Sequence, residues 1–190
     1  MDPLQILQVV VSALGKLGVP FMIVGSFASS SHGFPRFTQD LDLVAQLNRN
    51  QVDGFIAAFS RDFYLDRELI EQAVTNQTSF NIIHLQSSFK VDIFLLPRGG
   101  YFEEEFSRRV LKQIDPRTDF AAYVQSAEDA LLSKLDWYRR GGEVSENQWR
   151  DVIGILKIQA GRLDLDYLQK WAEELGISDL VLRARQEAGG

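Results

Sequence analysis

Hydrophobic and polar residues follow a helical period near the start of the chain. Apolar side chains recur there every three or four residues, which predicts an amphipathic helix. These side chains are Leu4, Leu7, Val10, Val11 and Leu14. Asp2 and Pro3 are typical of a helix start, and Gly18 is typical of a helix end.

The next apolar runs are short and have the length of β-strands. They cover residues 21–24, 41–45, 79–85 and 89–96. Helical patterns are expected between these runs, over residues 26–31, 51–59 and 67–74. Residues 97–100 contain one proline and two glycines, which breaks the pattern. We therefore expect helices and strands to be interspersed in the first half of the chain.

Helices alone are expected from Ser126 to the end. The patterns cover residues 126–140, 146–160, 164–175 and 178–186. Ser126 and Asp129 resemble a capping pair at the first of these helices. The expected fold class is α+β, a mixed β-sheet flanked by helices with a C-terminal helical bundle. We expect residues 1–120 to form the α/β core and residues 121–190 to form a helical region packed on it.

Composition and charge narrow the chemistry. The chain has no cysteine, which excludes disulfides, thiolate zinc sites and a cysteine nucleophile. The formal net charge of −6 argues against a large nucleic-acid footprint, because phosphate binding depends on clustered lysine and arginine. No apolar run approaches the ~18 residues that a membrane span needs. The N-terminal stretch also lacks the positive charge of a signal peptide. We therefore expect a cytoplasmic protein without a membrane partner.

Three aspartates are candidates for a metal site. Asp40 and Asp42 are two positions apart on a predicted strand, so both carboxylates project from the same face. Asp92 is embedded in another apolar strand. Carboxylates this close repel one another, and a divalent cation such as Mg²⁺ relieves the repulsion. The alternatives are a pair of solvated acids at a strand end and, for Asp92, an acid on an edge strand.

A phosphate-binding turn is expected just upstream of the aspartates. Gly25 and Ser26 lie where a strand passes into a helix, so free backbone amides at the helix start can meet a polyphosphate. Arg36 and Thr38 lie on the approach to the aspartates, where they can contact phosphate or brace the loop. The alternative is a plain strand-to-helix turn.

A second Asp-x-Asp pair has a different explanation. Asp164 and Asp166 lie at the start of a predicted helix, where Asp164 is a natural N-cap. We therefore expect this pair to be structural. Trp137, Trp149 and Trp171 lie on predicted helices at positions where we expect them to pack in the core.

Taken together, these motifs resemble the DNA polymerase β-like nucleotidyltransferase superfamily, and in particular small bacterial members related to AbiE-type toxins. The motifs that carry the resemblance are Gly25-Ser26, Arg36-x-Thr38-x-Asp40-Leu41-Asp42-Leu43 and Val91-Asp92-Ile93-Phe94. The resemblance implies a nucleotidyltransferase-like sheet and two Mg²⁺ ions, with Mn²⁺ as a substitute, held by the three aspartates. It also implies that Lys134 holds nucleotide phosphates and that Asp151 completes or orients the site.

The function expected from these motifs is transfer of a nucleoside monophosphate from an NTP to an acceptor hydroxyl, with release of pyrophosphate. The acceptor stays open between a small molecule, a protein and the 3′ end of a tRNA. An antitoxin-type protein partner is also open, because the resembling group includes toxins. The alternative is a non-catalytic module of the same fold that binds a nucleotide or a partner.

Overall fold

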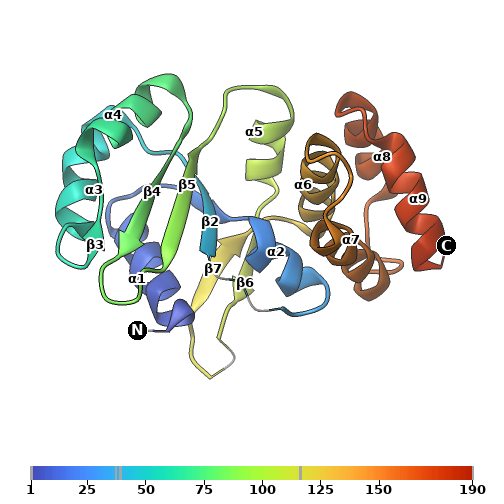
Figure 1. The fold of residues 1–190 in the computed structure, drawn as a ribbon, viewed down its shortest axis with the longest axis horizontal. Coiled ribbons are helices and arrows are strands. Elements are labelled where there is room, and N and C mark those ends of the chain that lie inside the picture. The colour runs from blue at the N-terminus through green and yellow to red at the C-terminus, as the bar shows by residue number, and fades with distance from the viewer. Residues whose placement is uncertain (1, 37, 39, 116, 190) are drawn as a thin grey trace. The chain divides into compact units, whose positions relative to one another are not determined.

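The computed structural model describes residues 2–36, 38, 40–115 and 117–189 (Figure 1). Its elements, in chain order, are α1 (Pro3–Lys16), β1 (Phe21–Ile23), α2 (Gly25–His32), β2 (Asp40–Ala45), the 3-10 helix η1 (Arg49–Gln51), α3 (Val52–Phe59), β3 (Phe63–Tyr64), α4 (Arg67–Asn76), β4 (Ser79–His84), β5 (Lys90–Leu95), α5 (Gly100–Ser107), β6 (Val110–Gln113), β7 (Ala121–Val124), α6 (Ala127–Arg140), α7 (Glu146–Ile158), α8 (Leu165–Glu174) and α9 (Ser178–Ala188). The expected α+β class is confirmed, and so is the C-terminal run of helices.

The contacts between these elements divide the chain into two compact units. The first unit holds residues 1–24 and 38–124, and the second holds residues 25–37 and 125–190. The short segment that contains α2 therefore belongs with the C-terminal helices, although it lies between two strands in the sequence. The sequence predicts a boundary after residue 120, and this remains a prediction because compactness alone does not define a folding unit.

A single sheet organises the first unit. Its strand order is β3-β4-β5-β2-β1-β7-β6. The β2–β5 and β1–β7 pairs are parallel, and the other neighbours are antiparallel. Buried and partly exposed residues alternate along β2 and β5, so one face of each strand packs on apolar side chains while the other stays accessible. That accessible face carries the candidate carboxylates.

The second unit is a group of helices, and side chains cap the starts of α6, α7 and α8. Ser126, Ser145 and Asp164 cap α6, α7 and α8, each by accepting a hydrogen bond from a backbone N–H of the first turn. The expectation that Asp164 is an N-cap is therefore confirmed. α2 packs against both α6 and α7 within this unit.

Several local features differ from the sequence-based expectations. The sequence did not predict β3, α5, β6 or β7, whose residues show no clear apolar period. Trp171 is buried as expected, with 4% of its surface exposed, but the expectation for Trp137 is wrong because 58% of it is exposed. A tryptophan on a helix can have the spacing of a core residue and still be exposed. The sequence alone does not reveal which neighbours the helix packs against.

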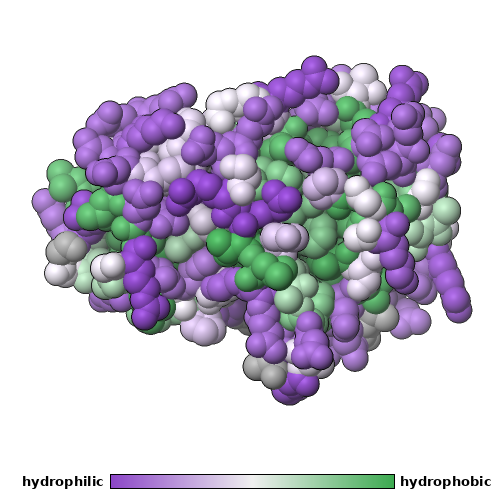
Figure 2. Space-filling model, turned by 180° about the vertical axis from the view of Figure 1, so that it is seen from behind, coloured by the Kyte–Doolittle hydropathy of each residue, from purple (hydrophilic) through white to green (hydrophobic). Residues whose placement is uncertain are grey.

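Hydrophilic residues predominate on the face shown in the space-filling view, with hydrophobic residues in separate groups between them (Figure 2). Within the part of the chain that the structure describes, no helix combines the length and the apolar character needed to cross a bilayer.

Candidate functional site

The three candidate aspartates lie on one face of two neighbouring strands in the first unit. Asp40 and Asp42 alternate on β2 with Leu41 and Leu43, which are 2% and 0% exposed. Asp42 is in direct register with Asp92 of β5, and the two strands run parallel. Register partners in a sheet project from the same face, with Cα atoms about 5 Å apart. The backbone therefore brings the three carboxylates to one patch.

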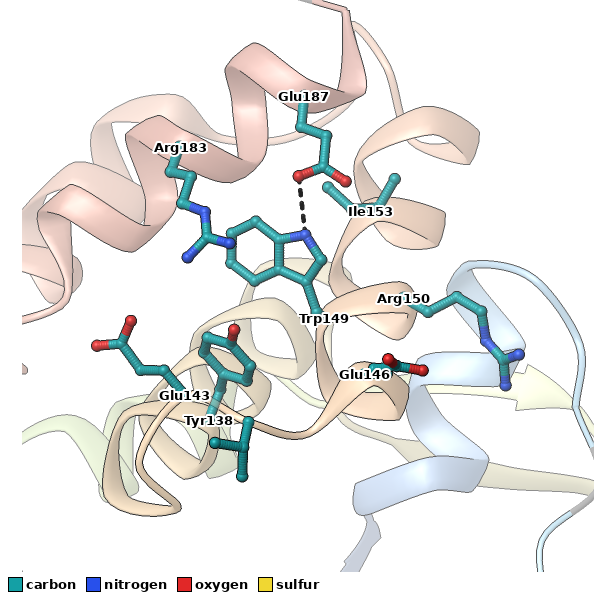
Figure 3. A pocket seen from close by; sticks show the side chains of 9 residues that line it. Tyr138, Glu143, Glu146, Trp149, Arg150, Ile153, Arg183 and Glu187 are labelled. Atoms are coloured by element: carbon teal, nitrogen blue, oxygen red, sulfur yellow. Dashed lines mark hydrogen bonds between the residues drawn. The ribbon is translucent and has the colours of Figure 1, made fainter.

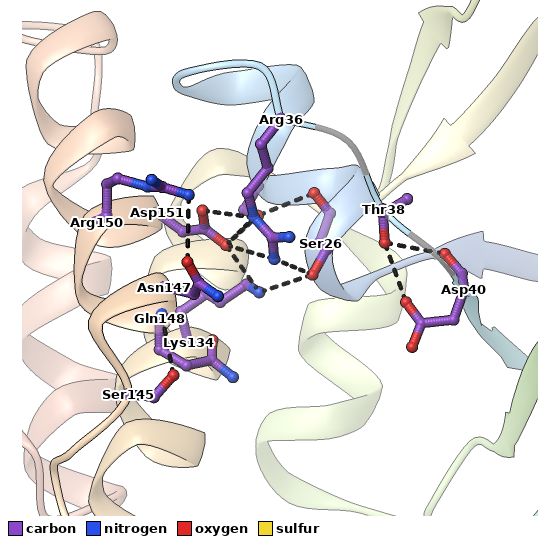
Figure 4. A network of polar contacts seen from close by, with 11 residues as sticks. Ser26, Arg36, Thr38, Asp40, Lys134, Ser145, Asn147, Gln148, Arg150 and Asp151 are labelled. Atoms are coloured by element: carbon purple, nitrogen blue, oxygen red, sulfur yellow. Dashed lines mark hydrogen bonds and ion pairs between the residues drawn. The ribbon is translucent and has the colours of Figure 1, made fainter.

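Hydrogen bonds and one ion pair hold parts of this carboxylate patch. The Thr38 hydroxyl donates to the backbone oxygen of Asp40 at 3.1 Å and to its carboxylate at 3.0 Å (Figure 4). The backbone N–H of Val24 donates to the carbonyl of Asp42 at 3.0 Å. Lys90 lies 2.6 Å from the Asp92 carboxylate. Thr38 thus braces the start of β2, which is one of the two roles that the sequence left open for it.

Lys90 is surrounded by negative charge. It is in register with Asp40 and two residues before Asp92, so it shares their face of the sheet. The pKa of Lys90 is raised, chiefly by the hydrogen bond to Asp92 and further by the charges of Asp92, Asp40 and Asp42, against an opposing effect of burial. The ammonium group is therefore held in its charged form beside the three carboxylates.

The donor set suits Mg²⁺, because this hard cation prefers carboxylate oxygens. As the side chains stand, however, no group of three histidine, cysteine, aspartate or glutamate residues among those described is arranged to hold a metal ion. The Asp92 carboxylate is engaged by Lys90 instead. Residue type and backbone register thus fit a metal site, and the side-chain rotamers would have to change for all three acids to act as ligands.

The second unit contains a cluster of ionic and polar groups around one serine. Lys134 lies 3.4 Å from the Ser26 hydroxyl, and the Arg36 guanidinium donates a short hydrogen bond to the same oxygen (Figure 4). Both cations also pair with Asp151, Arg36 at 3.0 Å and Lys134 at 3.1 Å. The side chain of Asp151 is only 3% exposed. The structure therefore brings together four of the residues expected to bind a nucleotide.

The start of α2 presents this serine. Gly25 has a φ of 64°, a left-handed conformation that side chains other than glycine adopt at a cost. The chain can therefore turn from the end of β1 directly into α2, leaving backbone N–H groups of the first helical turn unpaired within the helix. Ser29, one turn later, donates to Asp151 at 3.1 Å and thus ties α2 to α7.

Sequence reasoning did not single out three polar residues of these clusters. Lys90 could have been found from its alternation with Asp92, and Ser29 from its position one turn after Ser26. Asn81 of β4 is in register with Asp92 and extends the polar row across a third strand. Its position depends on strand pairing, which a single sequence does not reveal.

A surface pocket in the second unit is lined by none of the residues of the serine cluster. It has a volume of about 390 Å³ and contains Trp149 and Tyr138, whose ring centroids are 5.3 Å apart (Figure 3). The guanidinium of Arg183 lies over the Trp149 ring at 4.2 Å, and the indole N–H donates to Glu187 at 2.9 Å. The indole is thus engaged by the protein's own side chains, so this pocket is not our candidate for binding a base.

The fold, with three partly buried carboxylates on one face of its sheet, is nucleotidyltransferase-like. A crystal structure of an antigenic nucleotidyltransferase-like protein from Paracoccidioides brasiliensis matches with a TM-score of 0.54 at 16% sequence identity, over 95% of this chain and 92% of that one. The solution structure of the antibiotic-resistance factor ANT(2'')-Ia matches with a TM-score of 0.52 at 14% identity, over 99% of this chain and 96% of that one. JHP933 from Helicobacter pylori matches with a TM-score of 0.51 at 14% identity, over 93% of this chain and 77% of that one.

No protein-family model matches the sequence, and no curated protein matches it either. At these identities the similar structures establish the fold alone.

Proposed function

We propose that this protein is a metal-dependent nucleotidyltransferase that transfers a nucleoside monophosphate from an NTP to an acceptor hydroxyl and releases pyrophosphate. The observation that carries the proposal is the register of Asp42 with Asp92, which puts three carboxylates on one face of a sheet with this fold. The cluster of Ser26, Arg36 and Lys134 supports it, because a hydroxyl with two cations suits a polyphosphate.

Each cluster would carry one part of the chemistry. Asp40 and Asp42 would hold both metal ions, while Asp92 would hold one of them and act as, or beside, the base that takes the proton of the acceptor hydroxyl. When bound, two Mg²⁺ ions supply activation of the attacking oxygen and stabilisation of the leaving group. Gly25 and Ser26 would contact the leaving phosphates.

Arg36 and Lys134 would neutralise negative charge that builds up on the departing pyrophosphate. Asp151 would orient the two cations, because it pairs with both of them. It would do so without touching the phosphates itself, since phosphate and carboxylate repel each other.

A small-molecule acceptor is our first choice among the three classes. The net charge of −6 argues against a tRNA, whose phosphates need clustered positive charge. ANT(2'')-Ia, which has the same fold, is an antibiotic-resistance factor. A protein acceptor, the 3′ end of a tRNA and an antitoxin-type partner remain to be separated by experiment.

A non-catalytic nucleotide- or partner-binding module is the second candidate. The observation that favours it is the Lys90–Asp92 ion pair, together with the absence, among the described residues, of three acids already arranged around a metal position. Such a module would bind a nucleotide without releasing pyrophosphate.

Pyrophosphate release tests the proposal. We expect release from at least one of the four NTPs in the presence of Mg²⁺ and a suitable acceptor, and a loss of at least about 100-fold in the Asp40→Asn variant. Asp166→Asn is a matched control, since Asp166 belongs to the second Asp-x-Asp pair, is exposed in the first turn of α8, and its change should keep full activity. Addition of bulk tRNA, small hydroxyl compounds or protein sorts the acceptor class. Nucleotide binding without release by the wild type under every condition would favour the binding module.

A further inference from the structure

Lys90 occupies a position in the carboxylate patch that the proposed mechanism does not use. It begins β5, is in register with Asp40, and lies 2.6 Å from the carboxylate of Asp92. Its side chain is 45% exposed, whereas that of Asp92 is 19% exposed. The lysine therefore reaches from the accessible edge of the patch onto a carboxylate that is itself mostly buried.

The charge balance explains why a cation lies here. Three carboxylates on one face of two neighbouring strands repel one another, and partial burial strengthens the repulsion. Asp92, Asp40 and Asp42 all attract the Lys90 ammonium. One ammonium offsets part of this negative charge, so Lys90 stabilises the patch when no metal ion is bound.

The same contact opposes metal binding. Lys90 engages Oδ2 of the Asp92 carboxylate, a group that the proposed function assigns to a metal ion, and its positive charge would repel a divalent cation only a few ångströms away. The lysine side chain is flexible and nearly half exposed, so it can swing into solvent without disturbing the strand. Release of Asp92 by Lys90 thus needs only a change of rotamer.

We propose that Lys90 is an internal counter-cation of the carboxylate patch, which releases Asp92 when a divalent cation binds and thereby sets the affinity of the site for metal. Lys90 is then a positioning residue: it holds Asp92 while the site is metal-free and competes with the cation for it. This inference rests on the proposed function, because it takes the three aspartates as metal ligands.

The test measures Mn²⁺ binding to the full chain without nucleotide, by electron paramagnetic resonance of the free ion. We expect Lys90→Gln to bind Mn²⁺ at least about tenfold more tightly than the wild type, because a repelling charge is lost and Asp92 is set free. Lys90→Arg keeps the charge and should bind as the wild type does. Arg67→Gln is the matched control, since it removes a cation from another ion-pair group of the first unit, with Asp53 and Glu71, and should not change Mn²⁺ binding.

A second measurement follows thermal unfolding of the same proteins. Without metal, Lys90→Gln should unfold at a lower temperature than the wild type, and it should gain more from added Mg²⁺. Lower stability with unchanged Mn²⁺ affinity would mean that Lys90 is merely structural, and it would overturn the inference. If the wild type binds Mn²⁺ as tightly as Lys90→Gln does, the inference fails and the proposed function stands. If neither protein binds Mn²⁺, the inference fails, and pyrophosphate release in the presence of NTP and Mg²⁺ decides the proposed function separately.

Discussion

Asp151 shows how one buried acid can organise two cations. Its carboxylate is 3% exposed and accepts from Ser29, Arg36 and Lys134, on α2, on the segment after it and on α6. A buried charge is costly unless it is paired, and here it is paired twice. Because Arg36 and Lys134 share this anion, their positively charged groups both remain close to the Ser26 hydroxyl.

Replacement of Asp151 by asparagine should therefore weaken both stability and nucleotide binding. The change leaves two cations without their anion in a largely buried place, which should lower the free energy of unfolding by about 3 kcal/mol. Urea denaturation followed by circular dichroism measures this loss. The exposed acid Asp166 provides the comparison, since Asp166→Asn should change stability by less than about 0.5 kcal/mol. A similarly small change in Asp151→Asn would show that the pairing contributes little.

Single residues differ in how far the sequence reveals them. Asp40 and Asp42 could be chosen because alternation on a strand alone places them on one face. Their partner Asp92 could be identified as unusual, but its register with Asp42 depends on strand pairing. Lys90 was missed because a lysine at a strand start is ordinarily a solvated residue. Only the three acids around it give the lysine a role.

At the scale of elements, the close approach of α2 and α7 depends on two glycines. A Cβ atom built on Gly33, just after α2, would lie 2.8 Å from the backbone nitrogen of Ile155 and 2.9 Å from the carbonyl carbon of Gly154. A Cβ atom on Gly154 would meet Phe34 at 3.0 Å. These are backbone and ring atoms that cannot move aside easily. The absence of side chains therefore lets the end of α2 reach α7, where Asp151 lies.

Gly33→Ala should be destabilising for this reason. The added methyl group meets backbone atoms, so we expect a loss of about 2 kcal/mol in the free energy of unfolding. Gly15→Ala is the control: Gly15 lies in α1, a Cβ there would meet nothing within 4 Å, and alanine should raise stability by about 0.5–1 kcal/mol. Chemical denaturation of both variants gives the comparison. Equal stability of Gly33→Ala and the wild type would mean that the two elements can move apart without cost.

The elements that the sequence predicted share a clear period. The apolar side chains of α1 form one stripe, and buried residues alternate with less buried ones along β2 and β5. Both patterns arise because one side of each element faces the core. β6 was missed because it is an edge strand with three exposed residues out of four, so no buried face imposes an alternation. α5 was missed because three consecutive glutamates interrupt its apolar pattern. Both lie outside the two candidate clusters.

At the scale of the whole molecule, the second unit is assembled from two separate stretches of chain. Residues 25–37 join residues 125–190, although the strands of the first unit lie between them in the sequence. The contacts that join the stretches are specific: His32 lies 2.8 Å from the carbonyl of Gln125, and Gln159 donates to the carbonyl of His32 at 2.8 Å. Sequence reasoning could not assign α2 to this unit, because nothing in a local pattern says which distant helices it will contact.

The C-terminal helices should therefore depend on α2 for much of their stability. A fragment of residues 125–190 loses the partners of Asp151 from α2 and its following segment, and it exposes the surfaces on which α2 packs. Joining residues 25–36 to its N-terminus should restore them. A flexible linker must join residue 36 to residue 125. His32 contacts Gln125, and residue 36 is at most about 14 Å farther along the chain, so a linker of about 10 residues covers the span.

We expect the joined fragment to be more stable than residues 125–190 alone by at least about 2 kcal/mol in urea denaturation. An Arg36→Ala version of it should lose part of that gain. Equal stability of the two fragments would show that α2 contributes nothing to the helical unit, and Arg36 and Ser26 would then be held by other means.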